Sequence, residues 1–173
     1  MKKLSIAVAI FTLVACGGEG KKTAPKKVDT APTKVAEKEL EIIEEVEEKE
    51  IVEIRVSALG ESMAEIAFEP KALSVPANSR VILTFENKSS AEGMLHNFVL
   101  VELGSGSEIA AAGIKAGLDN NFVPDDKRII AYTKMSNMGE TITIEFDAPA
   151  KGSYHYVCTY PGHISMIGRL NVI

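Results

Sequence analysis

Several residue types are scarce in this chain of 173 residues, and each scarcity excludes a class of protein. Tryptophan is absent and only two cysteines are present, so a framework of disulfide bonds is excluded. The 19 Lys and Arg residues are outnumbered by 24 Asp and Glu residues, which leaves no excess of positive charge for binding nucleic acid. Only three histidines, His96, His155 and His163, are available for metal or acid–base chemistry.

The N-terminus has the pattern of a targeting segment. Two lysines precede an apolar stretch, residues 4–14, which is too short to span a bilayer but is typical of a signal-peptide core. The stretch ends in Leu13-Val14-Ala15-Cys16, which resembles the lipobox of bacterial lipoproteins. We therefore expect residues 1–15 to be a signal peptide and Cys16 to be the lipidated first residue of the mature protein. An ordinary secretory signal followed by a free cysteine is the alternative.

Residues 16–50 are predicted to form a flexible, charged tether, because Lys, Ala, Pro, Thr and Glu dominate their composition. Its half nearer the anchor is basic and its second half is acidic. The basic half can either contact anionic lipid head groups or serve as a solvated spacer. Anchor and tether together predict a domain at 51–173 that is held to a membrane of the bacterial cell envelope and faces the periplasm or the cell exterior.

From residue 51 onward, apolar and polar residues largely alternate, which is typical of half-buried strands. The predicted strands are 51–57, 65–75, 81–86, 96–102, 129–133, 141–147, 153–158 and 167–173. Ser105 and Glu108 can form a capping box before an alanine-rich run, which predicts a flap helix at 106–117, outside the sandwich, closed by Gly117. We therefore expect an all-β fold, a two-sheet β-sandwich of about eight strands with one short flap helix.

The side chains suited to metal binding gather near the C-terminus. Cys158-Thr159-Tyr160-Pro161-Gly162-His163-Ile164-Ser165-Met166 places a thiolate, an imidazole and a thioether in one loop between predicted strands. The turn at Pro161-Gly162 lets Cys158 and His163 point at one centre. A third strong ligand must come from elsewhere, and His96 is the available donor. Two histidines, one cysteine and a weak axial methionine form the ligand set of blue-copper electron-transfer sites.

These segments resemble the cupredoxins, and among them the azurins and auracyanins. Azurins carry Met-Gly-His-Asn-Trp-Val-Leu where this chain has Met94 to Leu100, and Cys-Thr-Phe-Pro-Gly-His where it has Cys158 to His163. The stretches 117–119, 124–126 and 131–134 also match, so the resemblance covers about residues 51–173. It implies a Greek-key β-sandwich of about eight strands that holds one copper ion and shuttles single electrons.

The resemblance also implies a role for each ligand. The expected equatorial ligands are His96, Cys158 and His163. Met166 is the expected axial ligand, although only two residues separate it from His163, a spacing closer to that of amicyanin than to that of azurin. The carbonyl of Leu95, which stands where azurin has a glycine, is a further candidate for the axial position.

Other positions are expected to support the site. Asn97 is expected to hydrogen-bond near Thr159 and so to fix the ligand geometry. Phe98 stands where azurin has a buried tryptophan, and the azurin disulfide cannot form because Cys158 is committed to metal and Cys16 to lipid. His155 is expected to face solvent.

His163 is expected to reach the surface as the electron port, within an apolar patch for brief docking. The expected patch consists of Met94, Tyr160, Pro161, Gly162 and Ile164. The expected partners are redox proteins such as cytochromes, reductases or oxidases, and the protein itself is expected to be a monomer.

Two other functional classes remain as alternatives. A copper chaperone or storage protein would need exposed, exchangeable clusters of methionine and histidine, whereas this chain has one compact set of ligands. A Cys-His hydrolase would need a separate general base and an oxyanion hole, which the loop between Cys158 and His163 does not offer. We therefore expect a copper protein that is not an enzyme, with the chaperone or store as the alternative function.

Overall fold

A computed structural model of the chain describes residues 48–173. The predicted signal peptide at 1–15, the lipidated Cys16 and all but the end of the predicted tether lie outside the described residues. The strands are β1 (Ile51–Leu59), β2 (Ala67–Glu69), β3 (Ala72–Val75), β4 (Arg80–Asn87), β5 (Val99–Glu102), β6 (Ile129–Tyr132), β7 (Thr141–Asp147), β8 (Gly152–Val157) and β9 (Ile167–Val172). No helix within residues 48–173 is long and apolar enough to cross a membrane.

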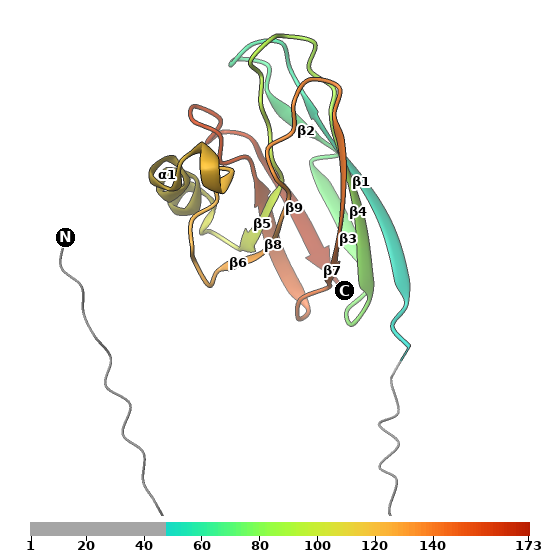
Figure 1. Cartoon of the computed structure of the whole chain (residues 1–173). Coiled ribbons are helices and arrows are strands. Elements are labelled where there is room, and N and C mark those ends of the chain that lie inside the picture. The colour runs from blue at the N-terminus through green and yellow to red at the C-terminus, as the bar shows by residue number, and fades with distance from the viewer. Residues whose placement is uncertain (1–47) are drawn as a thin grey trace, which may run out of the picture. The chain divides into compact units, whose positions relative to one another are not determined.

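The strands form two mixed sheets that pack as a sandwich (Figure 1). One sheet has the order β2-β1-β4-β7 and the other the order β3-β9-β8-β5-β6. The pairs β1–β4 and β3–β9 are parallel, and the remaining neighbours are antiparallel. The all-β sandwich with a short helix that the sequence predicts is therefore confirmed.

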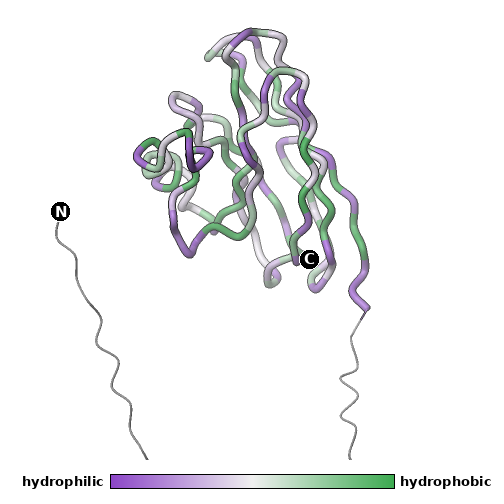
Figure 2. The backbone as a smooth tube through the Cα atoms, in the orientation of Figure 1, coloured by the Kyte–Doolittle hydropathy of each residue, from purple (hydrophilic) through white to green (hydrophobic). Residues whose placement is uncertain are grey.

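The core lies between the sheets and follows from the alternation of residues along each strand. In β4, Val81, Leu83 and Phe85 are fully buried, while the residues between them are more exposed. Figure 2 shows hydrophobic segments along the strands of both sheets. Aromatic rings join the two layers, with Phe98 stacked on Tyr156 at a centroid distance of 5.1 Å and tilted against Phe85 at 6.4 Å. Phe98 thus fills a fully buried core position.

Two predicted strands differ from the observed ones. The run at 65–75 is split at Pro70, which has no N–H to donate to a ladder. The chain changes sheets there, because β2 pairs with β1 whereas β3 pairs with β9. The run at 96–102 becomes regular only at Val99, since His96 makes an isolated bridge with Ser136. The split strand accounts for nine strands instead of about eight.

The predicted flap helix is present as α1 (Gly106–Ala116), but it does not lie free of the sandwich. Ile109 is fully buried and forms a small second core with Val99, Val101 and Val157. Gly117, with φ of 74°, ends the helix and donates its N–H to the carbonyl of Gly113. The helix is therefore packed onto the sheet that carries β5 and β8.

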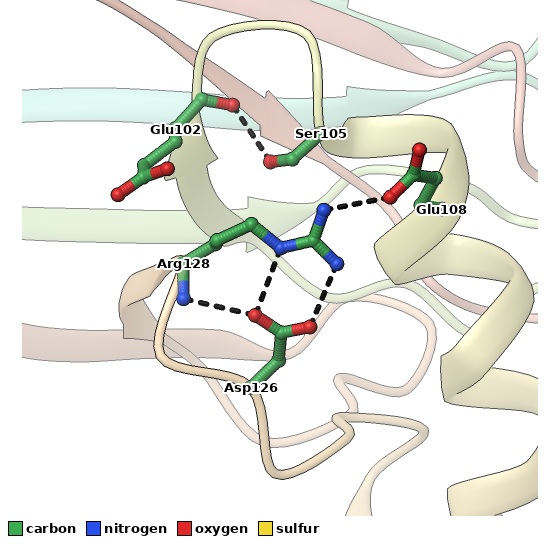
Figure 3. A network of polar contacts seen from close by, with 5 residues as sticks. All are labelled: Glu102, Ser105, Glu108, Asp126 and Arg128. Atoms are coloured by element: carbon green, nitrogen blue, oxygen red, sulfur yellow. Dashed lines mark hydrogen bonds and ion pairs between the residues drawn. The ribbon is translucent and has the colours of Figure 1, made fainter.

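The predicted capping box is wrong. The Ser105 hydroxyl donates to the carbonyl of Glu102 at 2.7 Å and makes no side-chain cap (Figure 3). Glu108 instead pairs with Arg128 at 2.6 Å, and the same guanidinium binds Asp126 through two nitrogens. A long-range cation thus competes successfully for the carboxylate that the local motif assigns to the helix N-terminus.

Candidate metal centre

Cys158 follows β8 directly and opens a loop that returns to β9. Two turns shape this loop, because the N–H of His163 bonds to the carbonyl of Tyr160 at 3.0 Å and the N–H of Met166 bonds to the carbonyl of His163 at 2.8 Å. The N–H of Cys158 bonds to the carbonyl of Met166 at 3.2 Å and closes the loop. The loop therefore begins and ends at one place, with the cysteine and methionine at its base.

His96 comes from a different part of the chain, between β4 and β5. Its backbone pairs with Ser136 in both directions, with N···O distances of 3.2 and 2.7 Å. The fully buried Asn87 donates through Nδ2 to the carbonyls of Met94 and Ser136, at 2.8 and 3.1 Å. The backbone around His96 is thus fixed on both sides.

The structure brings His96, Cys158 and His163 together in the protein interior. The Cys158 Sγ lies 3.9 Å from Nδ1 of His96 and 3.5 Å from Nδ1 of His163. One ligand atom from each residue can be chosen so that all three lie within 4.8 Å of one another. All three side chains are fully buried, and the imidazole centroids are 4.7 Å apart.

Burial sets the protonation of these groups when no metal is bound. It raises the pKa of the Cys158 thiol to about 11. Burial, with a smaller contribution from His163, lowers the pKa of His96 to about 4, and burial lowers the pKa of His163 as well. The imidazoles are therefore neutral at pH 7, as metal ligation requires, and the thiol must lose its proton to the incoming ion.

The donor set fits copper. Two neutral imidazoles, whose Nδ1 atoms face the Cys158 sulfur, and a thiolate suit a soft to borderline metal ion. Within the described part of the chain, Nε2 of His96 and Nε2 of His163 have no hydrogen-bond partner. Met166 is 1% exposed and belongs to the same core cluster as Cys158, whereas Leu95 is half-buried.

Asn97 and Thr159 lie against each other next to the ligands. The Asn97 amide donates to the Thr159 hydroxyl at 2.8 Å, and the Thr159 N–H donates back to the Asn97 Oδ1 at 2.9 Å. Each residue directly follows a ligand in the chain, His96 in one case and Cys158 in the other. The pair therefore joins the two ligand-bearing segments.

The expectation that His163 itself reaches the surface is wrong. The imidazole is fully buried, and the ring of Tyr160 meets it edge to face at 4.9 Å. Met63, from the turn between β1 and β2, lies over the neighbouring Gly162, where a Cβ would stand 2.5 Å from the Met63 methyl carbon. Of the expected patch, Ile164 and Gly162 are exposed, while Met94, Tyr160 and Pro161 are half-buried.

His155 lies in β8, outside the ligand cluster. It is half-buried beside Arg169 of β9, so it faces solvent only in part. Burial and the Arg169 charge lower its pKa.

Sequence reasoning missed Asn87 and Met63. The sequence does contain a signal for Asn87, because this polar residue occupies the inward position that follows Val81, Leu83 and Phe85 in the alternation of β4. Such a residue must find partners inside the protein, and here they are the carbonyls around His96. No sequence pattern points to Met63, because the residue it contacts, Gly162, lies far away in the chain.

A two-sheet β-sandwich with a buried cluster of His96, Cys158, His163 and Met166 defines a type 1 copper site. Residues 54–173 match the family described as copper binding proteins, plastocyanin/azurin family, and the chain belongs to that family. This membership confirms the predicted copper cofactor, and the azurin and auracyanin relatives support the expectation that the chain is not an enzyme.

The relatives include auracyanins and azurins. Auracyanin-A of Chloroflexus aurantiacus is 40% identical over 125 residues, which cover 70% of this chain and 74% of the relative. Azurin iso-2 of a Methylomonas species is 38% identical over 109 residues, which cover 59% of this chain and 84% of the relative. The solved structure of auracyanin A, a "blue" copper protein of Chloroflexus aurantiacus, superposes with a TM-score of 0.65 at 38% identity and covers 71% of this chain and 99% of that one.

Proposed function

We propose that this protein carries single electrons between redox partners and is held at a membrane by lipid attached to Cys16. The observation that carries the electron-transfer part is the convergence of the Cys158 thiol and the two imidazoles in a fully buried site. Copper bound there would exchange one electron between Cu(II) and Cu(I). His96, Cys158 and His163 would be its equatorial ligands, and Met166 the axial one with the Leu95 carbonyl as the competing candidate.

The protein's contribution is to hold these ligands still. Fast outer-sphere transfer needs a ligand set that changes little between oxidation states. The loop closed by the Cys158 and Met166 backbones, the Asn97–Thr159 pair and the Asn87 bonds to the His96 segment all restrain such movement. A buried, braced site also supports a carrier over a chaperone or store, which would have to release copper readily.

The electron would enter and leave through the apolar patch around the ligand loop, formed by Met94, Tyr160, Pro161, Gly162 and Ile164. Because His163 is buried, partners would contact the patch and not the imidazole itself. Ile164, at 48% exposure, is its most suitable probe. Ile164→Glu should slow electron exchange with the partner while leaving the visible spectrum unchanged. An unchanged exchange rate would show that partners dock elsewhere.

The cellular setting follows from the N-terminal sequence. A signal peptide at 1–15, a lipidated Cys16 and a tether to residue 50 would present a domain at 51–173 to the periplasm or the cell exterior. Its partners there would be cytochromes, reductases or oxidases, with the protein acting as a monomer. Cys16→Ala should move the protein from the membrane fraction to the soluble fraction, and continued sedimentation with membranes would contradict the anchor.

The spectrum of the Cu(II)-loaded protein tests the electron-transfer proposal. Wild-type protein should show intense visible charge transfer from Cys158 to copper, and Cys158→Ser should abolish it. An apo-acceptor with a higher copper affinity tests the alternative, because a carrier should retain its copper far longer than a chaperone would. A colourless Cu(II) complex would refute the proposal.

A further inference from the structure

Asn121 lies beyond the flap helix, directly after η1 (Leu118–Asn120), and contacts both the segment that carries His96 and the segment that pairs with it. Its carbonyl accepts a hydrogen bond from Nδ2 of Asn97 at 3.0 Å. Its side-chain Oδ1 accepts one from the backbone N–H of Met135 at 2.9 Å. Asn97 follows His96 in the chain, and Met135 precedes Ser136, which pairs with the His96 backbone. Asn121 therefore holds both strands of the bridge that carries the histidine.

The same contacts reach the cysteine. The Asn97 Nδ2 that bonds to the Asn121 carbonyl also donates to the Thr159 hydroxyl, and Thr159 follows Cys158. A displacement of Asn121 would therefore act on two ligand-bearing segments at once.

The backbone conformation of Asn121 suits this role, and few residue types adopt that conformation readily. It is left-handed, with φ of 53° and ψ of 28°, a conformation that asparagine, aspartate and glycine tolerate best. The turn also packs closely against α1, because a Cβ built on Gly113 would stand 2.2 Å from the carbonyl oxygen of Phe122. The turn is thus wedged between the flap helix and the metal centre.

We infer that Asn121 is a positioning residue of the copper site, and that its side-chain oxygen fixes the His96 segment by holding the N–H of Met135. This inference rests on the proposed function, because the placement of the ligands is read out only when copper is bound. A residue that merely completed a surface turn would affect folding stability without affecting the metal.

Three variants separate these roles. Asn121→Gly keeps the left-handed backbone and the carbonyl acceptor, so it should fold, but it removes Oδ1. Asn121→Asp retains an oxygen at the same place and should restore the contact. Asn78→Gly is the matched control, since Asn78 is also left-handed, with φ of 60°, and sits exposed in the turn between β3 and β4.

The measurements are the cysteine-to-copper charge-transfer band and the reduction potential of the copper protein, and amide hydrogen exchange of Met135 in the Cu(I) form. Asn121→Gly should shift the band and the potential and speed Met135 exchange about tenfold, the effect of losing one hydrogen bond. Asn121→Asp should keep the wild-type band and exchange rate. The reduction potential of Asn121→Asp does not test the contact, because the added negative charge shifts that potential directly.

The inference is overturned if Asn121→Gly has the wild-type band and potential, whatever its stability. It is also overturned if Asn121→Asp shifts the band as far as Asn121→Gly, or if Asn78→Gly produces the same shift. Failure of the proposed function looks different, because wild-type protein loaded with Cu(II) would then lack the intense band altogether.

Discussion

Asn97→Ala should remove the brace between the two ligand-bearing segments and cost the apo-protein about 4–6 kcal/mol of its free energy of unfolding. The substitution deletes two bonds donated by the Asn97 amide, to Thr159 at 2.8 Å and to Asn121 at 3.0 Å, and the one donated by the Thr159 N–H at 2.9 Å. Each such bond contributes about 1 kcal/mol net, and a buried N–H left unpaired adds about 1–3 kcal/mol. Both Asn97 and Thr159 are fully buried, so water cannot easily replace the lost partners.

Urea unfolding of the apo-protein, followed by far-UV circular dichroism because the chain lacks tryptophan, measures this loss. The midpoint should fall with an unchanged denaturant slope, which would show that stability changed and the denatured state did not. The copper-loaded variant should also show an altered charge-transfer band, since Thr159 adjoins Cys158.

Asn171→Ala provides the matched control. Asn171 of β9 accepts a bond from the Ser153 hydroxyl of β8 at 3.0 Å, which makes it another asparagine–hydroxyl pair, but a half-buried one. It should cost less than about 1 kcal/mol because water can take over its bond. If the two variants lose equal stability, or if Asn97→Ala loses less than the control, the bracing argument is refuted.

Three further predictions concern the flap, the pH dependence of stability and the axial ligand. Gly113→Ala should destabilise the apo-protein by about 1–3 kcal/mol, against the gain normal for alanine in a helix, because its Cβ would meet the carbonyl oxygen of Phe122; a higher urea midpoint would contradict this. The Arg128 guanidinium holds the pKa of Asp126 at about 2, below its ordinary value of 3.8, so the pair stabilises the fold fully above about pH 4 and this contribution is lost as pH falls to 2. Asp126→Asn should therefore flatten the acid limb of a plot of unfolding free energy against pH. An unchanged limb would show that the Asp126–Arg128 pair does not cause the loss of stability in acid. Met166→Gln should lower the reduction potential and Met166→Leu should raise it, both with copper retained; voltammograms matching wild type for both would assign the axial position to another group.

Local periodicity in the sequence determined the fold class. The alternation in β4 specifies which side chains are buried, and the turn residues between such runs limit each strand. The clustered Cys158, His163 and Met166 likewise identified a metal site, because one short loop contains three suitable donors. These predictions succeed because each depends on residues close together in the chain.

Only the tertiary structure decided which distant segments meet. The capping box fails because Arg128, twenty residues along the chain, takes the Glu108 carboxylate. His163 is buried because Tyr160 and the remote Met63 cover its loop. The bonds between Asn121 and the segments of Asn97 and Met135 likewise depend on where the turn after η1 is placed. Sheet pairing and layer packing bring these segments together, and no local sequence pattern encodes that pairing.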